Sequence, residues 1–394
     1  MKLAIQAPKW NAALGSESRD SERLCNARMS ESPQFERAAV ERYLKSVLGA
    51  EVRVLDLRRL GEPEDGKGFG YGVPVRVDYE LAGDRHESAV LHTIGPGSFG
   101  HEHMADRARI LLWSHQAFNH LPRHVRSLDV GGFLSGGGVI SLGGVEEFCL
   151  LTEYADGQPY ALDLEKLRDS GRLTELDVAR ADALCDYLVE IHAERGSGPG
   201  NDAGLYLRRN RELVGDGECI MGLADSYPPH PLFTPRVLEQ IEHRAVEWRW
   251  RLKKRTHRLR RVHGDFHPWN ILFTAGADFR VLDRSRGEYG DPADDVTCIT
   301  LNHVFFSLQR AGRLEGAFES LFLRFWDRYL EQTGDREMLE VAAPFFVFRA
   351  LVLASPVWYP ALENAARQKL LTFMLTVLEQ ETFDPRQVNA YCGA

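Results

Sequence analysis

The most constraining feature of this sequence is the segment 263–295, which reads HGDFHPWNILFTAGADFRVLDRSRGEYGDPADD. Two short apolar runs, 271–273 and 279–282, are separated by a polar turn, so the segment predicts a β-hairpin. Such a hairpin brings Asp283, just after its second strand, beside Asn270, just before its first strand. Two oxygen-bearing side chains from distant positions therefore converge without a long loop.

These side chains suit phosphoryl transfer when they are combined with Asp265, in the polar loop before the hairpin. Transfer of a γ-phosphoryl group needs little covalent help, so catalysis depends on positioning and on charge neutralisation. A carboxylate must accept or orient the hydroxyl proton of the acceptor. Mg²⁺ prefers hard oxygen ligands and needs only one or two protein carboxylates besides phosphates and water. We therefore predict Asp265 as the catalytic base, and Asn270 and Asp283 as ligands of Mg²⁺.

The same segment resembles the aminoglycoside phosphotransferase and choline kinase-like family, a branch of the protein kinase-like fold. The family pattern is H-G-D-x-x-x-x-N followed by a strand that ends in Asp, and this chain has HGDFHPWN and then VLDRSRGEYGDPADD. The resemblance implies the same base and metal ligands as above. It also implies that His263 orients the loop and that Asp295 supports it from the following helix. Arg286 matches a position that is basic in some relatives, and we count it with the catalytic residues.

The resemblance runs from about residue 35 to at least residue 310 and implies an α+β, two-lobed protein kinase-like fold. A small antiparallel β-sheet lobe would bind the nucleotide, and a larger helical lobe would carry the catalytic loop, the metal segment and a helical insertion over the acceptor pocket. The smaller lobe is expected over 33–152 and the larger lobe over 153–394. Within the larger lobe, the catalytic loop is expected at 263–270, the metal segment at 281–295 and the insertion at about 196–247.

The smaller lobe is expected to grip the phosphates. Apolar alternation predicts strands at 52–60, 73–81 and 87–94, followed by a helix near 102–114 and strands near 139–142 and 148–152. Between the first two strands lies GKGFGYG, where glycines let backbone N–H groups approach an anion, although many hairpin loops look alike. The candidate phosphate-binding residues there are Gly66, Lys67, Gly68 and Gly70.

One position departs from the family pattern. The third strand usually ends in a lysine that touches the phosphates and pairs with a glutamate, and here the matching residues are His92 and Glu102. Histidine is mostly neutral near pH 7, because its unperturbed pKa is about 6.5. Three outcomes stay open: His92 is protonated beside Glu102, Lys67 supplies the charge, or nucleotide binding is weak.

Other segments have more ordinary interpretations. LLTEYADGQPY (150–160) is expected to be the hinge between the lobes, with the backbone of Glu153 and Ala155 meeting the adenine edge. The basic stretch 248–261 is interpreted as an amphipathic helix that buries its tryptophans and leucines and extends its cations to water, in preference to an anion-binding surface. We interpret Asp291 and Asp294 as helix caps. Five aromatic residues are assigned to the core in preference to an aromatic box for a quaternary amine: Phe345, Phe346, Phe348, Trp358 and Tyr359.

Composition limits the possible partners and the compartment. The net charge of −9 argues against broad nucleic-acid affinity. The six cysteines are scattered without metal-ligand spacing, which favours reduced thiols. Residues 1–32 are polar and expected to be disordered, and residues 1–28 lack the apolar core of a signal peptide. Translation could begin at Met1 or Met29. The most apolar stretch, 341–359, contains two prolines and an arginine and predicts a buried helix, so we expect a cytoplasmic protein without a membrane span.

The sequence thus predicts an enzyme that moves the γ-phosphate of ATP, or of another nucleoside triphosphate such as GTP, to a hydroxyl of a small molecule, with Mg²⁺ as cofactor. Aminoglycoside, sugar, amino-alcohol and protein acceptors all remain open, as does the oligomeric state. One rival is a pseudokinase-type nucleotide-binding module, suggested by the missing lysine. Another is transfer of AMP to protein. The intact trio of Asp265, Asn270 and Asp283 favours transfer of phosphate.

Overall fold

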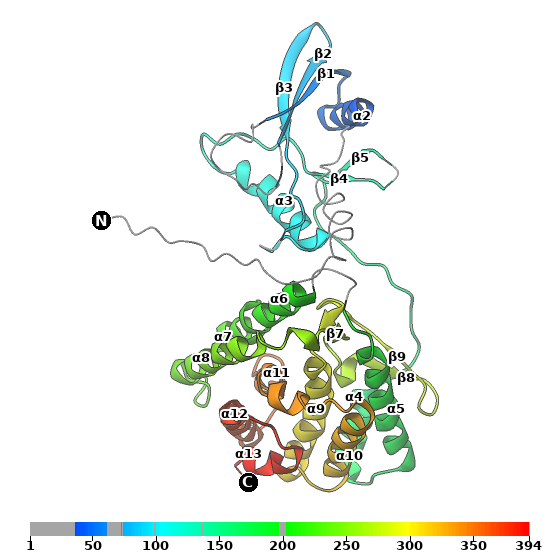
Figure 1. Ribbon diagram of the computed structural model, residues 1–394, viewed down its shortest axis with the longest axis vertical. Helices are drawn as coiled ribbons and strands as arrows, with labels where there is room; N and C mark the ends of the chain where they lie inside the picture. Colours follow the sequence, from blue (N-terminus) through cyan, green and yellow to red (C-terminus); the bar gives the residue numbers. More distant parts are fainter. Residues whose placement is uncertain are drawn as a thin grey trace, which may run out of the picture. The chain divides into compact units, whose positions relative to one another are not determined.

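The computed structural model describes residues 36–60, 72, 74–97, 100–135, 137–196 and 202–393. The chain divides into two compact units, Met1–Leu151 and Thr152–Ala394. The first contains a small antiparallel sheet and the second is mainly helical (Figure 1). The predicted α+β class is therefore confirmed.

The first unit is built on three antiparallel strands in the order β1-β2-β3, with bounds Val52–Arg59, Val75–Leu81 and Arg85–Leu91. All three predicted strands are present, and each end lies within three residues of its predicted position. Helix α2 (Arg37–Leu48) packs on β1 and buries Val40 and Leu44 against Val54 and Tyr79 of the sheet. This unit therefore has a core of its own, although a small one.

The rest of the first unit differs in part from expectation. Helix α3 (Met104–Phe118) is followed by the hairpin of β4 (Gly131–Phe133) and β5 (Val139–Ser141). The strand predicted near 148–152 is wrong, because residues 146–157 form no regular element. Leu150 and Leu151 are 88% and 95% exposed, so the apolar run that suggested a strand finds no neighbouring strand and no packing surface.

The second unit gathers its helices around α9 (Ala293–Ala311), which is buried on nearly every side (Figure 1). Its buried residues include polar ones, among them Asp294 and Asp295, which belong to the site described below. Four helices pack against α9: α4 (Tyr160–Ser170), α10 (Gly316–Thr333), α11 (Met338–Ala354) and α12 (Asn364–Glu379). Helix α5 (Glu175–His192) packs on α10, and the short α13 (Val388–Tyr391) packs on α12.

The aromatic residues assigned to this core divide into two groups. Phe345, Phe346 and Phe348 are buried in α11, as predicted. Trp358 lies beyond the end of α11 and is 64% exposed, so its assignment to the core is wrong. Tyr359 is half-buried and packs against the core, so the chain after Ser355 is still apolar but only partly buried.

The segment predicted as a helical insertion forms α6 (Asp202–Gly215), α7 (Ile220–Ser226) and α8 (Pro235–Leu252). Helix α8 begins with Thr234, whose hydroxyl accepts from the N–H of Val237, and with a proline in its first turn. Its position over an acceptor stays a prediction.

The amphipathic helix predicted over 248–261 is wrong beyond Leu252, where α8 ends. A 3-10 turn (Thr256–Arg258) and β7 (Arg260–Arg261) follow instead. Trp248 is buried as expected, but Trp250 is 59% exposed. Arg258, far from extending into water, is buried between two aspartates described below.

A small sheet in the second unit positions the segment 263–295. Strands β6 (Gln158–Pro159), β8 (Ile271–Phe273) and β9 (Phe279–Val281) are antiparallel neighbours, and β10 (Tyr289–Gly290) pairs with β7. Strands β8 and β9 pair Ile271 with Val281, so the hairpin prediction is confirmed. No helix among the described residues is long and apolar enough to cross a membrane.

Candidate active site

Asp265 is buried in the loop that precedes the hairpin and faces positive charge from two elements. Its Oδ1 accepts a hydrogen bond of 2.5 Å from Nη1 of Arg349, and its Oδ2 lies 3.8 Å from Nη2 of Arg286. Burial raises the pKa of this carboxyl, but the two guanidinium groups outweigh it and hold the pKa below its ordinary value. Asp265 is therefore ionised and acts as a hydrogen-bond acceptor at neutral pH.

Arg349, on α11, binds the loop that carries Asp265. Its Nη2 donates to the backbone oxygen of Gly264 at 2.8 Å and to Oδ1 of Asp294 at 2.6 Å. A guanidinium has a fixed fork of donors, so it sets the angle between the two carboxylates that it bridges. Asp294 was interpreted as a helix cap, which is wrong: its carboxylate pairs with Arg349, and burial raises its pKa.

Asp295 supports the catalytic loop from α9, as the sequence predicted. Its two carboxylate oxygens accept from the backbone N–H groups of His263 at 2.7 Å and Gly264 at 2.8 Å. His192 lies 3.1 Å away through Nε2. Burial raises the pKa of Asp295, but the contacts with His192 and with the backbone lower it more. Gly264 has φ +86°, a conformation that a side chain would strain.

His263 is buried against this loop and contacts its neighbour in the motif. Its Nδ1 accepts from the backbone N–H of Asp265 at 3.2 Å, and its ring lies edge-on to Phe266. The arrangement agrees with the orienting role that the resemblance implies. That role itself stays a prediction.

Asn270 and Asp283 both lie at the open end of the hairpin. The side-chain N–H of Asn270 donates to the backbone oxygen of Asp265 at 3.1 Å, and its own backbone oxygen accepts from the N–H of Leu282 at 2.8 Å. Asp283 is exposed, has φ +53°, and makes no hydrogen bond or ion pair with any described residue. A non-glycine residue in this conformation is uncommon and marks a site worth functional attention.

These two side chains offer one amide oxygen and one carboxylate, a hard-oxygen donor set that suits Mg²⁺. Within the described ranges, no group of three or more His, Cys, Asp or Glu side chains could hold a metal. An ion at Asp283 and Asn270 would therefore take its other ligands from phosphate oxygens and water.

A hollow of about 430 Å³ lies where the sequence predicted the hinge. Glu153 is exposed and Ala155 is half-buried in this stretch of chain. The hollow is bounded by the end of β8 and by the chain that leads into β6, and its lining residues are Tyr154, Asp156, Gly157, Gln158, Phe273 and Thr274.

The residues predicted to bind the phosphates belong to the first unit, and the structure describes only some of them. The predicted loop residues Gly66, Lys67, Gly68 and Gly70 lie outside the described residues. His92 is exposed just beyond the end of β3 and makes no hydrogen bond or ion pair with a described residue. Glu102 is half-buried and precedes α3. The structure therefore does not pair His92 with Glu102, and the residue that replaces the lysine stays open.

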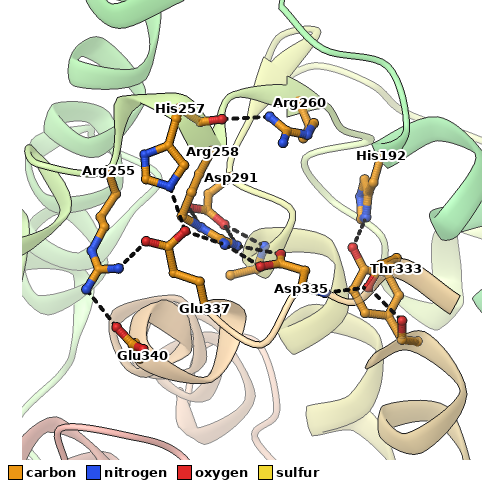
Figure 2. Close-up of polar contacts among 12 residues, drawn as sticks. His192, Arg255, His257, Arg258, Arg260, Asp291, Thr333, Asp335, Glu337 and Glu340 are labelled. Carbon is orange, nitrogen blue, oxygen red and sulfur yellow. Dashed lines mark hydrogen bonds and ion pairs between the residues drawn. The ribbon is translucent and has the colours of Figure 1, made fainter. Parts of the chain in front are cut away.

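A second charge network fixes the chain that follows Asp283 (Figure 2). Buried Arg258 donates to both oxygens of Asp291 at 2.9 Å and to both oxygens of Asp335 at 2.7 and 3.0 Å. Tyr206 also donates to Asp291 at 2.7 Å. Asp291 does cap α9, since its Oδ1 accepts from the N–H of Ala293, but its pairing with Arg258 was not foreseen.

This network continues to the surface through Glu337 (Figure 2). Glu337 pairs with Arg255, and His257 approaches its carboxylate to 2.7 Å. Burial raises the pKa of Glu337, but the hydrogen bonds from Arg255 and His257 lower it by more, so that the pKa falls to about 2. Glu337 lies just before α11, the helix that carries Arg349. These contacts therefore connect the beginning of α11 to residues 255–257, which precede the catalytic loop.

Comparison with known sequences decides the family. The sequence profile of the phosphotransferase enzyme family matches residues 122–332, more than half of the chain. The chain belongs to the phosphotransferase enzyme family. The family resemblance seen in the motif is thereby confirmed, and the matched range includes the whole segment 263–295.

Solved structures similar to this phosphotransferase are distant. An amicoumacin kinase is 13% identical with a TM-score of 0.37, and 94% of this chain and 97% of that chain are covered. An ethanolamine kinase from Plasmodium vivax is 10% identical with a TM-score of 0.31, covering 96% and 94%. A choline kinase from Streptococcus pneumoniae is 11% identical with a TM-score of 0.30, covering 86% and 97%. No curated protein sequence matches this one.

One residue of the phosphotransferase site was missed by the sequence analysis. Arg349 lies outside the range 122–332 that the family profile matches, and it is 84 positions from Asp265. No local motif therefore indicates its role. The available signal was a single arginine in the apolar helix 338–354. A charged residue in that setting is rarely buried without a partner, so a carboxylate partner could have been sought.

Proposed function

We propose that this phosphotransferase moves the γ-phosphate of ATP to a hydroxyl group of a small molecule. The observation that carries the proposal is the connection between Asp265 and Asn270. The amide of Asn270 is anchored to the backbone of Asp265, and the hairpin brings Asp283 to the same end. One short segment thus combines an ionised, buried carboxylate with two oxygen ligands.

Asp265 is proposed to accept a hydrogen bond from the hydroxyl of the acceptor and to orient it toward the phosphate. Its lowered pKa makes it a weak base, which is compatible with a loose transition state that needs positioning more than early proton removal. Asn270 and Asp283 would hold Mg²⁺, and the bound ion would neutralise charge on the phosphates. The hollow beside β6 and β8 supports a position for the nucleotide base.

The deciding experiment is the substitution Asp265→Asn. We expect transfer of labelled γ-phosphate to fall by about 100- to 10,000-fold, because the hydroxyl loses its oriented acceptor. Binding of Mg·ATP should be largely retained. Asp278→Asn is a matched control, since Asp278 is an exposed carboxylate in the turn of the same hairpin. Unchanged turnover in Asp265→Asn would contradict the assignment.

The same assay separates the two rivals. Transfer of label from the α-phosphate, with none from the γ-phosphate, would indicate AMP transfer. A passive nucleotide-binding module would show neither transfer nor ATP turnover sensitive to Asp265→Asn. The acceptor is to be found by screening hydroxylated metabolites and aminoglycosides.

A further inference from the structure

Arg286 lies beside Asp265 and has no hydrogen-bond partner among the described residues. Its Nη2 is 3.8 Å from Oδ2 of Asp265 and 3.9 Å from Oε2 of Glu218, and both distances exceed a hydrogen bond. Its Nε and Nη1 are buried and have no partner among the described residues. The side chain is only 19% exposed, so water reaches little of it.

This state is unusual for a guanidinium. Arginine has five N–H donors, and buried donors are nearly always satisfied. A donor that the protein leaves open, but shields from water, is placed to receive an oxygen from a ligand. The position is also fixed, because the guanidinium lies 4.9 Å from the ring centre of Phe348 on α11.

The surrounding charges leave Arg286 only partly neutralised. Asp265 already accepts a direct hydrogen bond from Arg349, which also binds Asp294. The side chain of Glu218 is 76% exposed, and its contact with Arg286 is the only ion pair that it makes with a described residue. Of the two arginines beside Asp265, Arg349 therefore leaves only its Nε without a partner, whereas Arg286 donates no hydrogen bond to any described residue.

We propose that Arg286 binds an anionic group of the acceptor, a carboxylate or a phosphate, beside the hydroxyl that Asp265 orients. The inference rests on the proposed function and narrows the acceptor class. The acceptor side is favoured because Arg286 lies between Asp265 and Glu218, and Glu218 belongs to the connection between α6 and α7. A planar guanidinium matches a carboxylate or phosphate through two parallel hydrogen bonds.

The short distance between the two residues limits the shape of the acceptor. One ligand that contacts both Asp265 and Arg286 must have its hydroxyl and its anionic group close together, on the same or neighbouring carbon atoms. Hydroxy acids and phosphorylated polyols have this arrangement. Acceptors whose charged groups are all cationic do not satisfy Arg286.

The test is a transfer assay with acceptors matched in size and different in charge. One set is glycerol, glycerate, glycerol phosphate and aminopropanediol, and a larger set is glucose, gluconate, glucose 6-phosphate and glucosamine. Each is offered to the full-length protein with labelled Mg·ATP, and kcat/KM is measured. We expect the anionic acceptors to be preferred. Comparison of the carboxylates with the phosphates then shows which of the two anionic groups Arg286 binds.

The variant Arg286→Gln tests whether the preference comes from this side chain. We expect the ratio of kcat/KM for the anionic over the neutral acceptor to fall by about 10- to 100-fold, the usual loss for a hydrogen bond to a charged group. Arg286→Lys keeps the charge and should retain part of the ratio. Arg313→Gln is the control, because Arg313 is an exposed arginine between α9 and α10.

Each other outcome overturns the inference in a recognisable way. A wild-type preference for neutral or cationic acceptors overturns the anion site and leaves the proposed function standing. A fall in kcat by the same factor for every acceptor in Arg286→Gln, with Arg286→Lys no better, assigns Arg286 to catalysis alone. Transfer to no acceptor, with ATP turnover equal in wild type and Asp265→Asn, overturns both the anion site and the proposed function.

Discussion

The loop that carries Asp265 and the turn that carries Asp283 lie in the same unit and are built in opposite ways. Asp265 is buried and paired with Arg349, and the N–H groups of His263 and Gly264 are bound by Asp295. Asp283 is exposed, has a positive φ and makes no polar contact with a described residue. One carboxylate is held by protein partners, and the other has none among the described residues.

The difference separates two ways in which a protein uses charge. A buried carboxylate that must be ionised and oriented needs protein partners, and those partners contribute to stability as well as to activity. A metal ligand at the surface needs only a fixed backbone, because the ion and the phosphates complete its surroundings. Substitutions on the side of Asp265 should therefore affect both folding and activity, and those on the side of Asp283 should affect activity alone.

The largest effect on stability is expected from Arg349→Leu. The change leaves the carboxylates of Asp265 and Asp294 buried without their partner, which should reduce the free energy of unfolding by about 3–5 kcal/mol. Denaturant titration measures it, with Arg313→Leu as the exposed control. A loss below about 1 kcal/mol, the range of surface ion pairs, would show that the Asp265 loop does not depend on this contact.

A smaller loss is expected from Asp295→Asn. An amide cannot accept from both N–H groups of the loop, so one buried donor is left unpaired at a cost of about 1–3 kcal/mol. Hydrogen exchange at His263 and Gly264 should accelerate together with the loss of stability. If those two amides stay protected, another group must hold the loop.

The third expectation concerns acid stability and Glu337. Its pKa in the folded protein, about 2, is below the ordinary 4.5, so the native state favours the ionised form. This contribution is present above pH 4.5 and is lost progressively as the pH falls toward 2. The stability difference between wild type and Glu337→Gln should therefore shrink over that interval. Glu340→Gln serves as control, and a difference that grows on acidification would contradict the sign.

The smallest effect on stability is expected from Asp283→Asn. Asparagine tolerates the left-handed backbone, and the exposed carboxylate has no protein partner to lose, so the free energy of unfolding should change by less than about 0.5 kcal/mol. Phosphate transfer, and nucleotide binding that depends on Mg²⁺, should fall strongly. A destabilisation comparable to Arg349→Leu would remove the distinction between the two sides.

The sequence predicted the parts of the site that are local. The hairpin follows from two apolar runs and a turn, and the contact of Asp295 with the loop follows from a motif that spans 263–295. Arg349 and Asp335 reach the site from positions far along the chain, and apolar patterning does not say which distant charge pairs with which. The pairs Arg349–Asp265 and Arg258–Asp291 therefore appeared only in three dimensions.

The errors share a physical cause. The strand predicted at 148–152 and the core position of Trp358 were inferred from apolar side chains that have no partner surface in the structure. The helix predicted over 248–261 was inferred from apolar and basic residues without a stop signal, and it ends at Leu252. Local pattern indicates what a segment could bury, whereas tertiary packing decides whether it does.

Phe348 lies against both arginines of the site, 4.9 Å from the guanidinium of Arg286 and 4.3 Å from that of Arg349. One ring thus separates two like charges and attracts each of them. Positions 286 and 349 are therefore coupled through the ring of Phe348, which carries no charge. Their substitutions should be non-additive, and the coupling energy should diminish in a Phe348→Leu background. Any attempt to redirect this enzyme to another acceptor has to treat the three positions as one unit of design.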